Sequence, residues 1–265
     1  MKVEEHDVDY SMSPPYLSEL KSLVQWDYFC YRDYKDERAF DSIIDIGCNT
    51  GTLSLFTRIL FPFAGIYSFD ASPAAVATTF KYKNFFNRMN GRWSDQNYTN
   101  GNCWEVYNYG LGDGSPISLK DGFYKDADIL NLNAKPGLGC AFVSESESSN
   151  TTSIETLTLS SLIEKCNINL EHKNSIKLDC EGCECSLYTD ENRKILRQFK
   201  HICGEIHFPP LEFGCNYDEH YVFWSSFEDI FDYKYFKSNS RQGIGHFLLT
   251  RKEDNIVGRK NLHFL

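Results

Sequence analysis

IIDIGCNTG, residues 43–51, is the stretch from which the fold of this chain can be predicted. It is a short apolar run with one acidic residue inside it, and it breaks into a turn that contains Gly47 and Gly51. Apolar residues with helical spacing follow from Leu53 to Leu60. This order is typical of a buried strand, a tight turn and a helix, which together open a nucleotide-binding α/β domain. Glycine lets backbone approach a ligand closely, and the first turn of the helix offers unpaired N–H groups.

Strand and helix patterns alternate along the rest of the central region. The expected strands are residues 65–69, 103–109, 156–159, 175–179 and 201–207, and the expected helices are 52–60, 73–88, 160–166 with Ser160 as its cap, 187–196 and 218–230. Strands joined by helices of this length favour crossover connections and a mostly parallel sheet, so the fold class is α/β. Two last strand patterns, at residues 231–236 and 243–251, suit a C-terminal antiparallel hairpin.

The chain divides into an N-terminal segment and one domain. Residues 1–40 begin with a polar, acidic tail, continue with apolar positions at helical spacing, and are expected to form a helical cap. Residues 41–265 form the domain. Within it, residues 121–150 are rich in Asp, Gly, Asn and Ser and are expected to be an inserted loop, either a lid or a plain solvated loop.

The composition of the chain indicates which binding partners and which cellular compartment to expect. The 265 residues carry a net charge of −10, which argues against a broad nucleic-acid footprint of clustered Lys and Arg. No apolar run reaches the roughly 18 residues that a membrane span needs, and the N-terminus lacks the apolar segment of a signal peptide. The ten cysteines are therefore expected to be free thiols, and the protein is expected to be cytoplasmic. Nothing in the sequence indicates the oligomeric state.

Three features fall at the carboxyl ends of successive expected strands, where open α/β sheets bind ligands. They are the 47–51 turn, Asp70, and the 110–113 turn. Asp70 can accept hydrogen bonds from both hydroxyls of a ribose. Asn49 occupies the place of the middle glycine that admits a pyrophosphate in dinucleotide-binding turns, so a ligand without phosphates, such as S-adenosylmethionine, fits better. Asp45 has two roles open to it: to hydrogen-bond the backbone of the turn or to contact the amino group of the cofactor.

Several strings resemble those of class I S-adenosylmethionine-dependent methyltransferases, and more narrowly those of the FkbM family. The opening Asp-x-Gly-Ala-Asn-x-Gly pattern of that family is similar to residues 45–51, with Cys48 in place of alanine. Its Phe-Glu-Pro-x-Pro block resembles residues 69–73, and its adenine-side turn resembles residues 109–113. Its Thr-Leu-Asp-x-Leu segment resembles part of 156–162, with Ser160 replacing aspartate. Its most specific string, Ile-Lys-x-Asp-x-Glu-Gly-x-Glu, is matched by residues 176–184, and Glu205 to His207 resembles a later strand end.

The resemblance covers about residues 41–210 and implies a fold, a cofactor and a reaction. The implied fold is Rossmann-like: a mostly parallel seven-stranded sheet with helices on both faces. The implied reaction is transfer of a methyl group from S-adenosyl-L-methionine to a hydroxyl of a small molecule, a glycan or a lipid-linked acceptor. The implied cofactor-binding residues are Asp45, Gly47, Asn49, Gly51, Asp70, Ala71, Gly110, Leu111 and Asp113.

Three residues are candidates for catalysis. Asp179 follows the fourth core strand, where the transferring methyl group should lie, and it is a candidate base or substrate anchor that Glu181 could assist. His207 is the alternative base, because its ordinary pKa lies near 6.5. The structural interpretations remain open: Asp179 as a helix cap, Glu184 as a first-turn residue favoured by the helix dipole, and Lys177 as a satisfied buried lysine.

No metal ion is predicted. Cys180, Cys183 and Cys185 resemble a zinc-binding run, but thiolate sites need a fourth ligand at suitable spacing, and the family string already accounts for the acidic residues here. A Mg²⁺ ion held by Asp179 with Glu181 or His207 is kept as the alternative.

The sequence leaves two alternative functions open. Lys177 and Asp179 resemble the Lys-Asp pair of RNA ribose 2′-O-methyltransferases, although the acidic net charge argues against a nucleic-acid partner. A non-catalytic protein of methyltransferase fold could bind a partner through residues 1–40 or 121–150. The joint presence of Gly47, Gly51 and Asp70 favours an enzyme over this alternative.

Overall fold

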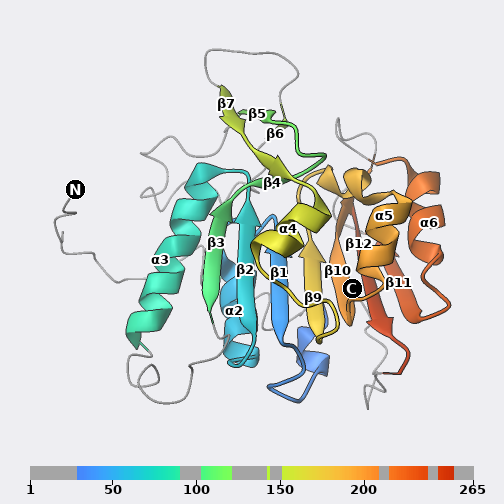
Figure 1. Cartoon of the computed structure of the whole chain (residues 1–265), viewed down its shortest axis with the longest axis horizontal. Helices are drawn as coiled ribbons and strands as arrows, with labels where there is room; N and C mark the ends of the chain where they lie inside the picture. The colour runs from blue at the N-terminus through green and yellow to red at the C-terminus, as the bar shows by residue number, and fades with distance from the viewer. Residues whose placement is uncertain are drawn as a thin grey trace.

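A seven-stranded sheet forms the centre of the computed structural model (Figure 1), in the order β11-β12-β10-β9-β1-β2-β3. β1, β2, β3, β9 and β10 run parallel, and β12 is antiparallel to both β10 and β11. The predicted α/β class and the C-terminal antiparallel strands are therefore confirmed. The strands are β1 (Ser42–Ile46), β2 (Gly65–Asp70), β3 (Trp104–Asn108), β9 (Asn174–Leu178), β10 (His201–His207), β11 (Phe231–Lys237) and β12 (Ile244–Arg251). The structure describes residues 29–89, 103–120, 142–143, 151–208, 215–237 and 244–253.

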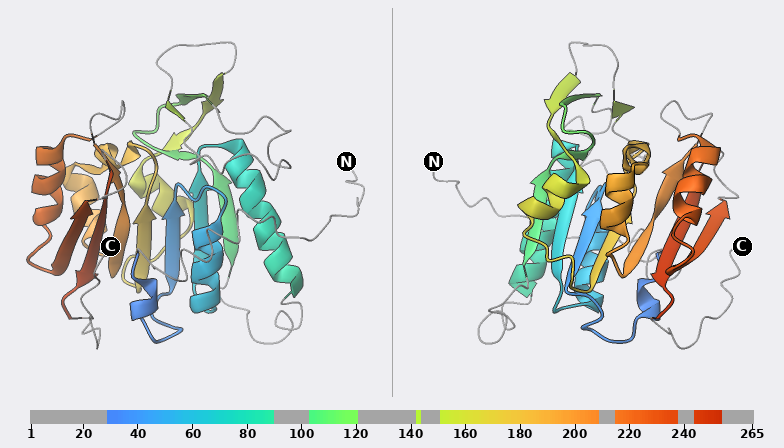
Figure 2. Two further views of the ribbon diagram at one scale, coloured as in Figure 1. Left: turned by 180° about the vertical axis from the view of Figure 1, so that it is seen from behind. Right: turned by 45° about the vertical axis from the view of Figure 1, so that its right-hand side comes forward.

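Helices cover both faces of this sheet. α4 and α5 lie on the face toward the viewer in Figure 1, and α2 lies behind the sheet, as the turned views of Figure 2 also show. Each face has its own cluster of buried apolar side chains, one contributed largely by α4 to α6 and the other by η1, α2 and α3. The helices are η1 (Tyr31–Asp33), α2 (Thr52–Leu60), α3 (Pro73–Met89), α4 (Leu159–Lys165), η2 (Cys183–Leu187), α5 (Asp190–Leu196) and α6 (Tyr217–Ser225).

β1 is buried from both faces. Ile43, Ile44 and Ile46 are each at most 2% exposed, and β1 pairs in parallel with β2 on one side and with β9 on the other. A strand covered on both faces needs a continuous apolar run rather than an alternating one, which is why residues 43–46 could be recognised from sequence.

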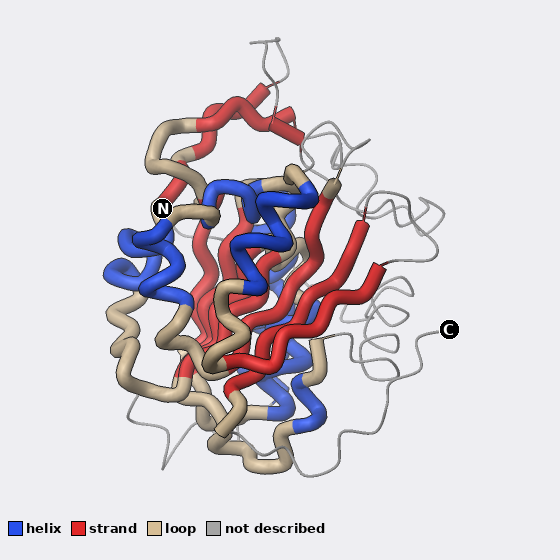
Figure 3. The backbone as a smooth tube through the Cα atoms, turned by 90° about the vertical axis from the view of Figure 1, so that its right-hand side faces the viewer, coloured by secondary structure: helices blue, strands red, loops and turns tan. Residues whose placement is uncertain are grey.

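Two small sheets lie above the carboxyl edge of the main sheet (Figures 1 and 3). The 110–113 segment, expected to be a turn, begins with β4 (Gly110–Leu111), which pairs with β8 (Thr156–Leu157) outside the main sheet. β5 (Ile117–Lys120) pairs with β6 (Phe142–Val143) and with β7 (Thr151–Ile154). Of the expected 121–150 loop only residues 142–143 are described, and they form β6.

Two helix boundaries differ from the sequence prediction. The cap of α4 is Thr158 rather than Ser160, because the Thr158 side chain accepts a hydrogen bond from the N–H of Ser161. The single helix expected through residues 187–196 is two elements, η2 and α5. Thr189 separates them, since its backbone is extended and its side chain caps α5 by accepting a hydrogen bond from Asn192 N.

The expected N-terminal cap is described only from residue 29 onward; residues 1–28 lie outside the described part of the chain. Tyr31, in the short helix η1, is fully buried and its hydroxyl hydrogen-bonds Ser175 Oγ on β9 at 2.9 Å. Phe40 packs edge-on against the same ring. This segment is therefore part of the core that supports the central strands. Across the described residues, every helix is too short or too polar to span a bilayer.

Candidate cofactor and acceptor site

The turn after β1 is built from left-handed backbone. Gly47, Asn49 and Gly51 have φ values of 71°, 49° and 78°. Asparagine is among the few residues that tolerate this conformation, which gives Asn49 a structural reason to replace a glycine. The N–H groups of Gly47 and Cys48 both donate to the carbonyl oxygen of Phe69, at 2.9 Å. The turn is thereby fixed against the end of β2.

Gly47 also brings the turn against the end of β9. A Cβ atom at this position would overlap the carbonyl group of Asp179, and Asp179 N donates to Ile46 O at 3.1 Å. The predicted cofactor turn and the predicted catalytic aspartate are thus in backbone contact.

Asp70 closes the turn. Its Oδ2 accepts a hydrogen bond from Asn49 N at 2.7 Å, and its Oδ1 accepts one from Ser72 N at 2.8 Å. Burial raises the pKa of this carboxyl to about 6, and the two backbone donors oppose that rise. Each carboxylate oxygen keeps a second lone pair that can accept a hydrogen bond from a ligand.

Asn108 fixes the segment after Asp70, and the sequence analysis missed it. Its side-chain amide donates to the carbonyl oxygens of Asp70 and Ala71, each at 2.9 Å. A polar residue at the end of the third strand was the available signal. Gly110 lies close by, since a Cβ placed on it would be 3.7 Å from Ala71 Cβ. Ala71 and Gly110 are therefore neighbours at the ends of β2 and β3.

The other two adenine-side candidates lie apart from this group. Leu111 is 6% exposed and packs in the core cluster of α4 to α6. Asp113 is exposed, and its carboxylate accepts a hydrogen bond from Ser115 N within its own turn.

Asp45 lies beneath the turn. Its carboxylate is 1% exposed, accepts a hydrogen bond from Ser54 Oγ at 2.5 Å, and is 3.2 Å from Lys177 Nζ. Lys177 Nζ also donates to the carbonyl oxygens of Ile46 and Gly47, at 3.3 and 2.7 Å. Burial lowers the pKa of Lys177, but Asp45 and Asp179 outweigh it and raise that pKa well above the ordinary range. Lys177 thus links the Asp45 carboxylate to the backbone of the turn. Its buried ammonium group is paired, as the structural interpretation of Lys177 requires.

Acidic side chains gather beyond Asp179. The side chains of Asp179 and Glu181 are 29% and 27% exposed, whereas that of Glu184 is fully buried. The Glu184 carboxylate accepts hydrogen bonds from the N–H groups of Cys180 and Gly182, each at 2.8 Å. Its location in the first turn of η2 supports the structural interpretation of Glu184. Asp179 and Glu181 remain accessible to an acceptor.

His207 lies among three glutamates. Its side chain is 2% exposed, with Nε2 3.2 Å from Glu181 Oε2 and 3.3 Å from Glu205 Oε1, and with Nδ1 3.8 Å from Glu184 Oε1. Burial lowers the pKa of His207, but Glu184, Glu205 and Glu181 outweigh it and raise the pKa to about 11. Glu205, which was quoted only as part of a motif, is therefore a member of the site.

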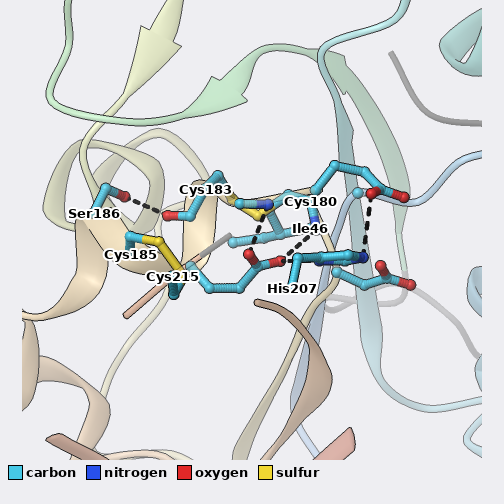
Figure 4. The surroundings of a disulfide bond; sticks show 12 residues. Ile46, Cys180, Cys183, Cys185, Ser186, His207 and Cys215 are labelled. Atoms are coloured by element: carbon cyan, nitrogen blue, oxygen red, sulfur yellow. Dashed lines mark hydrogen bonds and ion pairs between the residues drawn. A yellow bond between two sulfur atoms is a disulfide. The ribbon is translucent and has the colours of Figure 1, made fainter. Parts of the chain in front are cut away.

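The cysteines at this site are paired, which corrects the expectation of free thiols. Disulfides join Cys180 to Cys183 and Cys185 to Cys215 (Figure 4), and the N–H of Cys215 donates to the carbonyl oxygen of His207 at 2.6 Å. The zinc interpretation loses support because a disulfide sulfur is not a thiolate ligand. Among the described residues, Cys48, Cys103 and Cys166 are outside these two disulfides and keep their thiol groups.

The family model described as "Methyltransferase FkbM domain" matches residues 45–237 of the chain. No curated protein matches the sequence.

Among solved structures, the chain is similar to a methyltransferase FkbM from Methylobacillus flagellatus KT, at 11% identity and a TM-score of 0.46. That match covers 80% of this chain and 44% of the other, so the chain spans less than half of that protein. A SAM-dependent methyltransferase from Aquifex aeolicus matches at 9% identity over 88% of this chain and 96% of the other, with a TM-score of 0.41. A fibrillarin/Nop5p complex matches at 11% identity over 94% and 88%, with a TM-score of 0.41.

Proposed function

We propose a reaction for this chain from the premise that it belongs to the FkbM methyltransferase family, whose model matches residues 45–237. The chain transfers the methyl group of S-adenosyl-L-methionine to a hydroxyl oxygen of a small molecule, a sugar or a lipid-linked acceptor. The observation that carries this proposal is the backbone contact between Gly47 and Asp179. It joins a turn suited to the donor directly to an accessible carboxylate suited to the acceptor.

The donor is held by the turn and by the ends of β2 and β3. Asp70 accepts hydrogen bonds from the ribose hydroxyls, and its own backbone bonds to Asn49 and Ser72 keep its carboxylate fixed. Ala71 and Gly110 would contact the adenine. Since the turn has no pyrophosphate-admitting glycine at Asn49, it suits a nucleoside without phosphates.

The reaction is a direct displacement. The acceptor oxygen forms a bond to the methyl carbon while the bond between that carbon and sulfur breaks, and the electron pair returns to the sulfonium sulfur. The hydroxyl proton leaves to a base, and the site supplies alignment as well as that base. Among the three candidates, Asp179 and Glu181 are accessible to an acceptor, whereas His207 is only 2% exposed. We therefore assign the base or anchor role to Asp179 or Glu181.

Ribose methylation of RNA is disfavoured by one feature of the site. The Lys177 side chain is 5% exposed and is bound to Asp45, Asp179 and two backbone carbonyls, so it is not available to a ribose. The net charge of −10 also disfavours a nucleic-acid partner. A cytoplasmic location stays a prediction from the sequence.

Replacing Asp70 tests the donor site. We expect Asp70→Asn to weaken S-adenosylmethionine binding by roughly 10- to 100-fold in calorimetric titration, because charge-assisted hydrogen bonds are worth about 1.5–3 kcal/mol each. Asp190→Asn, at an exposed carboxylate in the first turn of α5, is the control and should bind as the wild type does. A folded wild type that fails to bind the donor would overturn the proposal.

The affinity for the donor should also depend on pH below about 6. Burial raises the pKa of Asp70 to about 6, so its carboxyl becomes protonated as the pH falls through that value and loses acceptor capacity. We expect the affinity to be constant above pH 7 and to fall by up to ~10-fold per pH unit below the pKa. Asp70→Asn should have a flat profile over this range, whereas Asp190→Asn should keep the wild-type slope.

The acceptor class is tested by methyl transfer. Tritiated donor is supplied with pools of hydroxylated small molecules, glycans and capped RNA, and the labelled product is separated by class. Label in the first two pools supports the proposal, and label confined to RNA would overturn it.

A further inference from the structure

We propose that Asp179, Glu205 and His207 form a binding site for a divalent metal ion. Binding of the ion is argued from these residues alone, whereas its role in catalysis rests on the proposed function. The ion would bind the acceptor hydroxyl next to the methyl donor.

The topology places the three side chains together. β9 and β10 are parallel neighbours in which Leu178 pairs with Gly204, so the next residues, Asp179 and Glu205, follow at the same level. His207 is two positions further along β10 and shares a face with Glu205. One ligand atom from each of the three residues lies within 4.8 Å of the other two. Ligands bonded at ~2.1 Å to one ion are roughly 3–4 Å apart, so modest side-chain rotations would close the site.

The burial and orientation of the His207 ring also support a metal site. It is 2% exposed, and neither of its ring nitrogens has a hydrogen-bond partner among the described residues. Nε2 nevertheless points at Glu181 and Glu205, whose nearest oxygens are 3.2 and 3.3 Å away. The buried imidazole is thus held at ion-pair distance from two carboxylates, and a metal ion could be bound between these same groups.

Glu184 faces the other ring nitrogen of His207, Nδ1. Its Oε1 is 3.8 Å from His207 Nδ1, and its carboxylate is fixed by the N–H groups of Cys180 and Gly182. Metal-bound histidines commonly donate their second ring N–H to a carboxylate, which sets the tautomer and the ring orientation. Nε2 of His207 would therefore bind the ion while Nδ1–H faces Glu184.

The donor set indicates the kind of ion. One imidazole and two carboxylates, with Glu181 as a further carboxylate, suit Mn²⁺ or Mg²⁺ better than an ion that prefers thiolates. Because Asp179 is 29% exposed, the ion would keep coordination positions open to solvent or to an acceptor oxygen. A hydroxyl bound there would be deprotonated more easily, with its proton passing to Glu181 or to water. Asp179 would then be a ligand rather than the base.

The test uses Mn²⁺ because its electron paramagnetic resonance signal is lost when it binds to the protein. Mn²⁺ also binds cysteine thiols only weakly. Protein stripped with a chelator is titrated with MnCl₂ by calorimetry and by electron paramagnetic resonance, and Mg²⁺ is then added as a competitor. We expect one Mn²⁺ per chain and at least 10-fold weaker binding in Glu205→Gln and in Asp179→Asn. The second variant lies at a partly exposed position, so it keeps the test informative if the first does not fold.

Donor binding is measured on the same samples. Asp70→Asn should keep Mn²⁺ and lose S-adenosylmethionine, whereas Glu205→Gln should lose Mn²⁺ and keep the donor. Wild type that binds the donor but shows no saturable Mn²⁺ or Mg²⁺ binding would overturn the metal site while leaving the proposed function intact. Mn²⁺ binding that is unchanged in both carboxylate variants would place the ion elsewhere and equally overturn it.

Discussion

Lys177→Met is expected to lower the free energy of unfolding by about 3–5 kcal/mol, because breaking a buried ion pair leaves the partner charge uncompensated. Lys177 Nζ contacts Asp45 Oδ1 at 3.2 Å, and the side chains of the two residues are 5% and 1% exposed. Without the ammonium group, Asp45 keeps Ser54 as its hydrogen-bond donor and Ile46 O keeps Asp179 N, whereas Gly47 O loses the Lys177 donor at 2.7 Å. The measurement is the midpoint of denaturant unfolding, with the slope checked for constancy.

Two further variants isolate the cause of that loss. Lys173→Met removes an exposed lysine immediately before β9 and should change stability by less than about 0.5 kcal/mol. Lys177→Met combined with Asp45→Asn should be more stable than Lys177→Met alone, since the buried charge is then gone. If Lys177→Met unfolds at the same denaturant concentration as the wild type, Lys177 does not hold the turn.

The succession of strands and helices along the chain could be predicted well from the sequence, because each element depends on signals in neighbouring residues. The apolar run of β1 and the glycines of the turn that follows it are signals carried by adjacent residues. The main-sheet strands follow these signals, but their order does not, since β9 pairs with β1 rather than with β3, the strand before it in the main sheet. The break between η2 and α5 was missed because it depends on the capping bond of Thr189, which competes with a continuous helical pattern.

The site was predictable only in part. Gly47, Asp70 and Asp179 could be named from strand ends, since all three lie at the carboxyl edge of the sheet. Burial could not be read in the same way: the sequence left Asp45 a backbone role or a cofactor contact, and in the structure its side chain is 1% exposed and bound to Lys177. The Cys185–Cys215 pair depends on a contact between η2 and the segment before α6, which spacing along the chain does not encode.

Gly47→Ala is the second variant with a large expected effect, because two costs add at one position. The backbone there has φ +71°, where a side chain costs about 1–2 kcal/mol. The new methyl group would also overlap the carbonyl group of Asp179, a backbone atom that cannot rotate away. The ends of β1 and β9 must then separate, and overpacking of this kind costs about 1–3 kcal/mol more. We expect a total loss of about 2–5 kcal/mol.

Gly114→Ala separates these two costs. Gly114 has φ +94°, but a Cβ added there would meet nothing nearer than Thr158 Cγ2, at 4.0 Å. It should therefore show the backbone cost alone, about 1–2 kcal/mol, and should bind S-adenosylmethionine as the wild type does. Gly47→Ala should unfold at a lower denaturant concentration than Gly114→Ala and should lose donor binding under conditions where it is still folded. Equal stability of the two variants, with donor binding kept in both, would mean that the contact between Gly47 and Asp179 neither holds the strand ends together nor shapes the donor site.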